Sequence, residues 1–315
     1  MTAVGLRAYQ YVDELLPSAF ELLQNISDQI RTDSLIDKRL SRHQSLISIW
    51  SSIREQLLQV EEELRIFCDS EWRIMEQYQD GHICSHSLAA TCTIFTLSYF
   101  KKLSYHDKNI LVYGLLFHDI AKKGKPAIKT KDPQHPFTST STTLQIFNTL
   151  GWIQHPECID STTSLMNSAF FFQDWGNFMD NTKLPQIYQA LLYLTGLTPS
   201  ITTDFTDYFS VSTSHPTENL FVFEILAIIL LHQSVDLDPK YPNFTPLNEE
   251  EILRYLSPRL LKILTILHLG DNGSYNLPIK FEDWTFVTRI WRTYKRLKKL
   301  FGRRRRRRGS GGSKG

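Results

Sequence analysis

Four residues of this chain combine metal-binding side chains with an apolar setting: His86, the adjacent pair His118 and Asp119, and Asp271. Each lies at the end or edge of an apolar run that predicts a buried helix. A buried imidazole or carboxylate needs a partner that offsets the free energy lost on leaving water. A divalent cation is such a partner, and mixed imidazole and carboxylate ligands suit Mn, Mg, Fe, Zn or Ni. The alternative is a set of core residues with ordinary hydrogen bonds, because a single His-Asp pair occurs by chance in many sequences.

The order of these residues resembles the HD superfamily of metal-dependent phosphohydrolases, whose pattern is a His, then a His-Asp pair, then a distant Asp. His86 in HSLAAT matches the first His, GLLFHDIAKKGKP holds the pair, and Asp271 in ILTILHLGDNG matches the closing Asp. The resemblance covers roughly residues 80–275. It is greatest to the branch that includes CCA-adding tRNA nucleotidyltransferases, without their nucleotidyltransferase head. His135 takes the place of a further His of that branch, and the next His of the branch has no counterpart.

The resemblance implies a phosphohydrolase or phosphodiesterase that hydrolyses a phosphoester, above all of a nucleotide. One or two metal ions on the four matched residues would lower the pKa of a bound water and polarise the phosphoryl group. Lys122, with Lys123 and Lys125, would bind and neutralise the phosphoryl oxygens, and Asp119 would orient the water. The alternative function is a non-catalytic module of the HD fold that binds a nucleotide or RNA.

Three other histidines have predicted roles at this site. His82 precedes His86 by four residues, as does the general acid of the similar cyclic-nucleotide phosphodiesterases, so His82 is a candidate proton donor to the leaving group. As the alternative, Gly81 ends a helix and His82 is a solvated cap residue. His135 is a second candidate donor. His232 closes a very apolar segment, where it is either a ligand or substrate contact or a core histidine with a hydrogen bond.

Apolar residues at three- and four-residue steps predict that helices position these side chains, and the predicted fold class is all-α, an HD-type helical bundle. Ser104 with Asp107 predicts a cap at the start of the helix that leads into His118. Short helices joined by loops are expected between 160 and 214, since strand signals are scarce. The main helices are expected over 86–103, 109–123, 139–150, 217–232, 247–256, 258–269 and 282–301.

The chain divides into four predicted regions, in chain order: an N-terminal helical region over 1–79, an HD-type phosphohydrolase domain over 80–281 with an insertion at about 155–215, a basic amphipathic helix over 282–301, and a disordered Arg-rich tail over 302–315. The N-terminal helices are a candidate surface for homo-oligomers. The tail is either native or an engineered addition, because a Gly-Ser spacer follows its six arginines.

The formal net charge of +2 is the sum of two unlike parts. From Lys295 onward the chain has 11 Lys or Arg residues and no acid, so residues 1–294 hold 24 basic and 33 acidic groups. The basic helix and tail predict a nucleic-acid partner or a membrane surface, or else an ordinary solvated face. The acidic remainder fits a domain whose carboxylates include metal ligands.

Composition excludes several classes of protein. With 42% hydrophobic and 22% charged residues, the chain is neither disordered nor collagen-like. The four cysteines have no regular spacing, which predicts reduced thiols in the cytoplasm, or in the nucleus if the arginine run is a native import signal. No apolar run approaches the roughly 20 residues that cross a bilayer, so no transmembrane segment is expected.

Overall fold

The computed structural model describes residues 10–15, 20–21, 23–25, 27–28, 83–122, 132, 134–173, 176–179, 181–197, 218–238, 247–273 and 285–310. Most of the predicted N-terminal region over 1–79 lies outside these residues, as do His82, Lys123 and Lys125. Within the described residues the protein is an all-α helical bundle, as predicted, with one small two-stranded hairpin.

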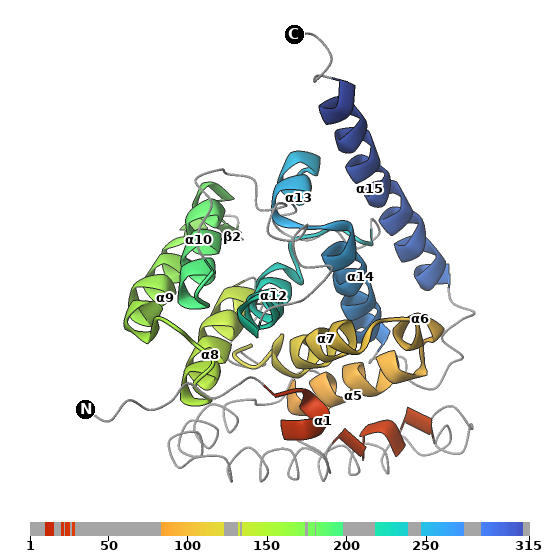
Figure 1. The fold of residues 1–315 in the computed structure, drawn as a ribbon, viewed down its shortest axis with the longest axis horizontal. Coiled ribbons are helices and arrows are strands. Elements are labelled where there is room, and N and C mark those ends of the chain that lie inside the picture. The colour runs from red at the N-terminus through yellow and green to blue at the C-terminus, as the bar shows by residue number, and fades with distance from the viewer. Residues whose placement is uncertain are drawn as a thin grey trace.

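The helices assemble around a central one, α12 (Figure 1). In chain order the elements are α1 (Val12–Leu15), α5 (Ile83–Thr96), α6 (Ser98–Lys101), α7 (Tyr105–Phe117), α8 (His135–Thr149), α9 (Ile159–Ser168), β1 (Phe170–Gln173), β2 (Gly176–Met179), α10 (Leu184–Leu194), α12 (Glu218–Leu231), α13 (Glu249–Tyr255), α14 (Pro258–Gly273) and α15 (Thr285–Ser310). Short 3-10 turns at Pro156–Cys158 and Asn181–Lys183 precede α9 and α10.

Helix α12 is buried because it is apolar on every side. Each residue from Leu220 to Leu231 is at most 5% exposed, and α12 packs against α7, α8, α10 and α14. A helix without a polar face is stable only inside a protein or a membrane. Among the described residues, none of the helices combines the length and apolar character needed to cross a bilayer. The predicted buried helix in this segment is therefore confirmed.

Side-chain caps begin helices α7 and α13, and the first of them was predicted. Ser104 Oγ accepts a hydrogen bond from the Asp107 N–H at 3.1 Å at the start of α7, as predicted. Asn248 and Glu251 form a reciprocal capping box at the start of α13. Each cap satisfies N–H groups that a helix leaves without partners in its first turn.

The segment expected to hold only short helices also contains an antiparallel hairpin. Strand β1 pairs with β2, with Phe170 opposite Met179 and Phe171 opposite Phe178. Consecutive aromatic residues favour extended backbone, and pairing across the hairpin supplies their main-chain hydrogen bonds. Helices α9 and α10, on either side, agree with the prediction.

Helix α15 is longer than predicted. It continues to Ser310, so residues 302–310, which were expected to be disordered, are helical. Arginine is a good helix former, and consecutive arginines extend a helix that is already packed. Its apolar stripe, formed by Val287, Ile290, Tyr294, Leu297 and Leu300, is buried, and α15 packs on α14 and α13.

One acidic residue interrupts the apolar surface of α12 and is neutralised by α14. Glu224 is fully buried, and Arg259 donates to both of its carboxylate oxygens at 2.5 and 3.0 Å. Arg259 Nε also donates to Asp107 Oδ1 of α7 at 2.6 Å. This arginine therefore ties three helices together.

We predict that Arg259→Met destabilises the protein by about 3–5 kcal/mol, because it removes the guanidinium from the buried Glu224 carboxylate and leaves only His106 Nε2, at 3.6 Å, beside it. Denaturant unfolding monitored by circular dichroism measures the change. The matched control is Arg296→Met, whose exposed ion pair with Glu249 is expected to contribute about 0–1 kcal/mol. Equal losses in the two variants would contradict this role for Arg259.

Helices α14 and α5 approach closely at Gly270. A Cβ atom built on Gly270 would lie 2.6 Å from Ile94 Cγ2 and 3.0 Å from the Ala90 carbonyl oxygen. These contacts are too short for any side chain, so only glycine allows this approach. The adjacent Asp271 thereby reaches α5.

We predict that Gly270→Ala lowers the free energy of unfolding by about 1–3 kcal/mol, because the new methyl group overpacks the contact with α5. Gly302→Ala is the matched control, since nothing lies within 4 Å of a Cβ there. That change is expected to raise the free energy by up to about 1 kcal/mol through helix propensity. A stabilising effect of Gly270→Ala would refute the close packing.

Candidate metal centre

The four residues predicted as metal ligands come together where three helices meet. His86 lies on α5, His118 is the C-cap residue of α7 with Asp119 directly after it, and Asp271 lies near the end of α14. Helices α5, α7 and α14 pack on one another in all three pairs (Figure 1). Asp271 Oδ1 lies 2.8 Å from His86 Nε2 and 3.6 Å from His118 Nε2.

The Asp119 carboxylate joins two groups of side chains. Its Oδ2 lies 3.5 Å from His86 Nε2 and 3.6 Å from His118 Nε2. Its Oδ1 lies 3.1 Å from His135 Nε2 and 3.8 Å from His232 Nε2, and those two nitrogens are 3.0 Å apart. The first group is His86, His118, Asp119 and Asp271. The second group is Asp119, His135 and His232.

Backbone carbonyls orient three of the imidazole rings. His118 Nδ1 donates to Leu115 O at 2.8 Å and His232 Nδ1 to Ile229 O at 2.7 Å, each within the last turn of its helix, where carbonyls lack helical partners. His135 Nδ1 donates in the same way to the carbonyl three residues before it. A neutral imidazole has a single N–H, so Nε2 of each ring is an acceptor. When these rings are neutral, three acceptor nitrogens therefore face the Asp119 carboxylate.

This arrangement fits a metal ion. Among the residues that the structure describes, His118 Nε2 and Asp119 Oδ1 are buried and find no hydrogen-bond partner, which costs about 1–3 kcal/mol for each unsatisfied group. A cation satisfies both atoms, whereas a further acceptor would not. The ligand atoms of His86, His118 and Asp119 lie within 4.8 Å of one another, and so do those of Asp119, His135 and His232. Imidazole and carboxylate together are donors for a divalent transition metal.

The charges of the centre also favour a cation. Burial would raise the pKa of both carboxyls, but His118 and Lys122 hold the pKa of Asp119 well below its usual value, and His118 and His86 do the same for Asp271. Burial would lower the pKa of His118, but Asp119 and Asp271 raise it. The two carboxylates are therefore ionised and favour positive charge between them, and a divalent cation bound there would take the place of a proton on His118 Nε2.

His232 differs from His118 in its electrostatic setting. Burial, followed by the charges of His135 and His118, lowers the pKa of His232 well below its usual value. The ring is therefore neutral at pH 7. Neutral imidazole is the form that binds a metal through its free nitrogen.

Lys122 brings a positive charge into the centre. Its Nζ donates to Asp119 Oδ2 at 2.7 Å, and the residue is only 8% exposed. The Asp271 side chain, at 19% exposed, is more accessible than those of His86, His118 and Asp119, which are at most 7% exposed. Asp271 is therefore the most exposed of the four residues of the first group, and Lys122 lies beside the shared carboxylate.

The structure brings together two histidines, His135 and His232, that the sequence interpretation treated separately. His135 was expected to donate a proton, and His232 to contact substrate or ligand; both lie in the second group, against Asp119. They are 97 residues apart, so no local spacing signals their contact. The only hint was the placement of His232 at the end of an apolar helix. His82, Lys123 and Lys125 lie outside the described residues.

We predict that the protein binds one divalent metal ion at each group, and that substitutions in one group remove its ion without removing the other. His232→Gln is expected to remove one ion, His118→Gln the other, and Asp119→Asn both, because Asp119 belongs to both groups. Metal content after loading with Mn²⁺ and gel filtration, measured by mass spectrometry, tests this. His155→Gln is the control, since His155 stacks on Tyr193 at the surface. Equal metal content in the His155 and His118 variants would contradict the site.

Comparisons with known proteins yield no relative of this chain. No family model, no curated protein and no solved structure matches it. The chemistry of the candidate metal centre is therefore inferred from the geometry of its residues alone.

Proposed function

We propose that this protein is a metal-dependent phosphohydrolase that hydrolyses a phosphomonoester or phosphodiester of a nucleotide. The observation that carries the proposal is the convergence of imidazole acceptors and ionised carboxylates on Asp119, with a buried lysine beside them. The sequential order of His86, the His118-Asp119 pair and Asp271 resembles the HD superfamily, which supports this reaction class.

The two groups have separate roles in this proposal. The first group, His86, His118, Asp119 and Asp271, would hold one ion, and Asp119 with His135 and His232 would hold a second. A divalent ion bound there supplies Lewis acidity toward the phosphoryl oxygens and a lowered pKa for the attacking water. His118, His135 and His232 enter the reaction already oriented, because each Nδ1 is held by a carbonyl.

Lys122 and Asp119 would act on the substrate and the water. Charge develops on the phosphoryl oxygens as the ester bond breaks, and a nearby ammonium stabilises that charge. Lys122 Nζ is held 2.7 Å from Asp119 Oδ2 and can serve this purpose. Lys123 and Lys125, which follow in the sequence, would add positive charge for an anionic substrate. Asp119 would also accept a hydrogen bond from the attacking water and so orient it.

The leaving oxygen takes up a proton when the ester bond breaks. His135 was a candidate donor, but its Nδ1 is held by a carbonyl and its Nε2 faces Asp119 and His232. We therefore assign His135 to metal binding in this proposal. His82 remains the proposed general acid, from its spacing of four residues before His86.

We predict that Asp119→Asn lowers the Mn²⁺-dependent hydrolysis of bis-p-nitrophenyl phosphate by roughly a thousandfold, since a metal contributes several kcal/mol to such reactions. Initial rates with this substrate and with a panel of nucleotides measure the effect. Asp160→Asn, an exposed aspartate on α9, is the matched control and is expected to keep full activity.

Two outcomes would reject the proposed activity. Full activity of Asp119→Asn, with its metal lost, would exclude the metal centre as the active site. Tight nucleotide binding by the metal-loaded wild type, without turnover of any substrate in the panel, would favour the non-catalytic nucleotide-binding or RNA-binding module instead. Isothermal titration with nonhydrolysable nucleotide analogues distinguishes that second outcome from a lack of binding.

A further inference from the structure

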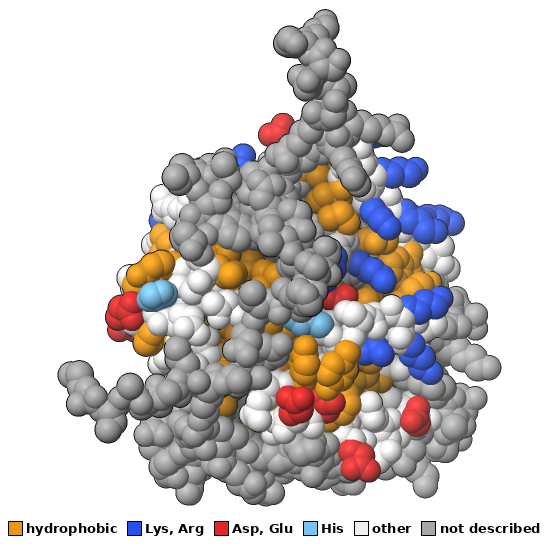
Figure 2. All heavy atoms as spheres, viewed as in Figure 1, with side chains coloured by type: hydrophobic (Ala, Val, Ile, Leu, Met, Phe, Trp, Pro, Cys, Tyr) orange, Lys and Arg blue, Asp and Glu red, His pale blue; other side chains and the backbone are white. Residues whose placement is uncertain are grey.

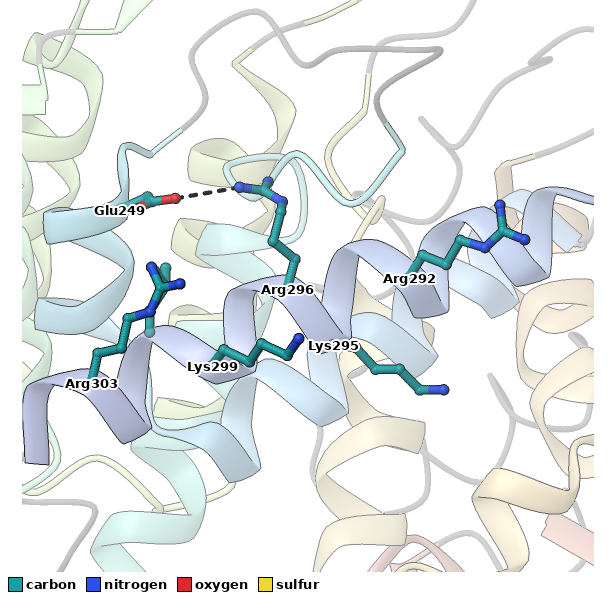
Figure 3. A pocket seen from close by; sticks show the side chains of 7 residues that line it. Glu249, Arg292, Lys295, Arg296, Lys299 and Arg303 are labelled. Carbon is teal, nitrogen blue, oxygen red and sulfur yellow. Dashed lines mark hydrogen bonds and ion pairs between the residues drawn. The ribbon is translucent and has the colours of Figure 1, made fainter. Parts of the chain in front are cut away.

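A groove with a volume of about 470 Å³ lies between α15 and the start of α13. Five cationic side chains of α15 line it, together with Glu249 of α13 and the nearly buried Leu300. Figure 3 shows these side chains along one side of α15. We call this surface the basic groove, and its cations are Arg292, Lys295, Arg296, Lys299 and Arg303.

The positive charge of the basic groove is largely uncompensated. Arg296 Nη1 lies 3.3 Å from Glu249 Oε1, but both side chains are more than half exposed, at 62% and 58%. Water and salt screen such a pair strongly. Within the part of the chain that the structure describes, the other four groove cations form no ion pair. A cluster of like charges held on one helix costs free energy unless an anion binds to it.

Helix geometry arranges these cations in a row. The five cations are separated by three, one, three and four residues along α15, at positions 292, 295, 296, 299 and 303. This spacing puts them on one helical face. At 1.5 Å rise per residue the row is roughly 16 Å long. The opposite, apolar stripe of α15 is packed on α13 and α14, so the basic row is turned away from the core.

The cationic surface continues beyond the groove toward α6. The rings of Tyr99 and Trp291 lie 4.3 Å apart, which places α6 against the first half of α15. Lys101 and Lys102, at the end of α6, are exposed. Figure 2 shows Lys and Arg side chains gathered over α15 and beside α6. A surface of this length contacts several anionic groups in succession rather than a single one.

We infer that the basic groove binds the phosphate backbone of a single-stranded nucleic acid. A linear row of exposed Lys and Arg complements a linear row of phosphates, and such contacts act through charge without reading the base sequence. The structure favours this ligand over a membrane surface, because an interfacial helix inserts its apolar face into lipid, whereas that face of α15 is buried in the protein. The groove does not involve the metal centre.

Binding of a fluorescein-labelled oligothymidylate to the full chain, measured by anisotropy over a series of salt concentrations, tests the inference. The triple variant Arg292→Gln, Lys295→Gln and Lys299→Gln is expected to bind at least about tenfold more weakly in 0.1 M salt. Its plot of log affinity against log salt is expected to be shallower by about 2, since each phosphate contact on a single strand contributes about 0.7 to the slope.

Two matched variants separate the groove from general charge effects. The first is a control triple variant that removes the same net charge outside the groove lining, with the changes Lys183→Gln, Lys262→Gln and Lys298→Gln. This control is expected to bind the oligonucleotide like the wild type. A variant with Arg304 to Arg308 all changed to Gln measures nonspecific binding by the arginine run. If only that variant loses binding and the groove triple does not, the inference is overturned.

Two further outcomes decide between ligands and functions. Wild-type binding to phosphatidylserine vesicles without binding to the oligonucleotide would overturn the inference in favour of a membrane. Asp119→Asn is expected to retain oligonucleotide binding, so failure of the proposed hydrolysis and failure of the groove are distinguishable. Unchanged circular dichroism spectra and melting temperatures of the groove variants, which alter only exposed side chains, exclude unfolding as the cause of lost binding.

Discussion

The arrangement of the bundle depends on an ionised carboxylate, that of Asp119, buried to 1% exposure at the meeting point of several helices. An isolated charge at such a depth is very costly, so the chain must surround it with compensating groups. Lys122 supplies one charge directly. His86, His118, His135 and His232 supply nitrogens on both sides of the carboxylate. Nearly every polar contact in the centre follows from this requirement.

Helix ends perform a second function in this site. Carbonyl groups in the last turn of a helix lack the N–H donors that carbonyls earlier in the helix have. In α7 and α12 two such carbonyls accept hydrogen bonds from His118 Nδ1 and His232 Nδ1 instead. The same contact that satisfies the helix terminus fixes the tautomer of the ring and directs its Nε2 inward. Thus the points at which two buried helices stop are also the points at which these two imidazole rings are oriented. This explains why both histidines directly follow long apolar runs.

The core and the site use the same helices. Gly270 permits the approach of α14 to α5, and the residue after it, Asp271, reaches His86 as a result. Arg259, at the other end of α14, neutralises Glu224 of α12 and contacts Asp107 of α7. Helix α14 is therefore held at both ends, by a charge cluster at one and by close packing at the other.

The sequence by itself determined the helical class, most helix positions and the buried α12, because periodicity and caps are local signals. It also singled out the four residues of the first group, from the order of His and Asp along the chain. It missed the hairpin at Phe170–Met179 and the helical continuation of α15 to Ser310, where local preference and packing act together. Only the tertiary structure decided that His135 and His232 lie 3.0 Å apart against the far oxygen of Asp119. Such a contact depends on how α8 and α12 cross, which is set by packing over the whole bundle and leaves no mark at any sequence spacing.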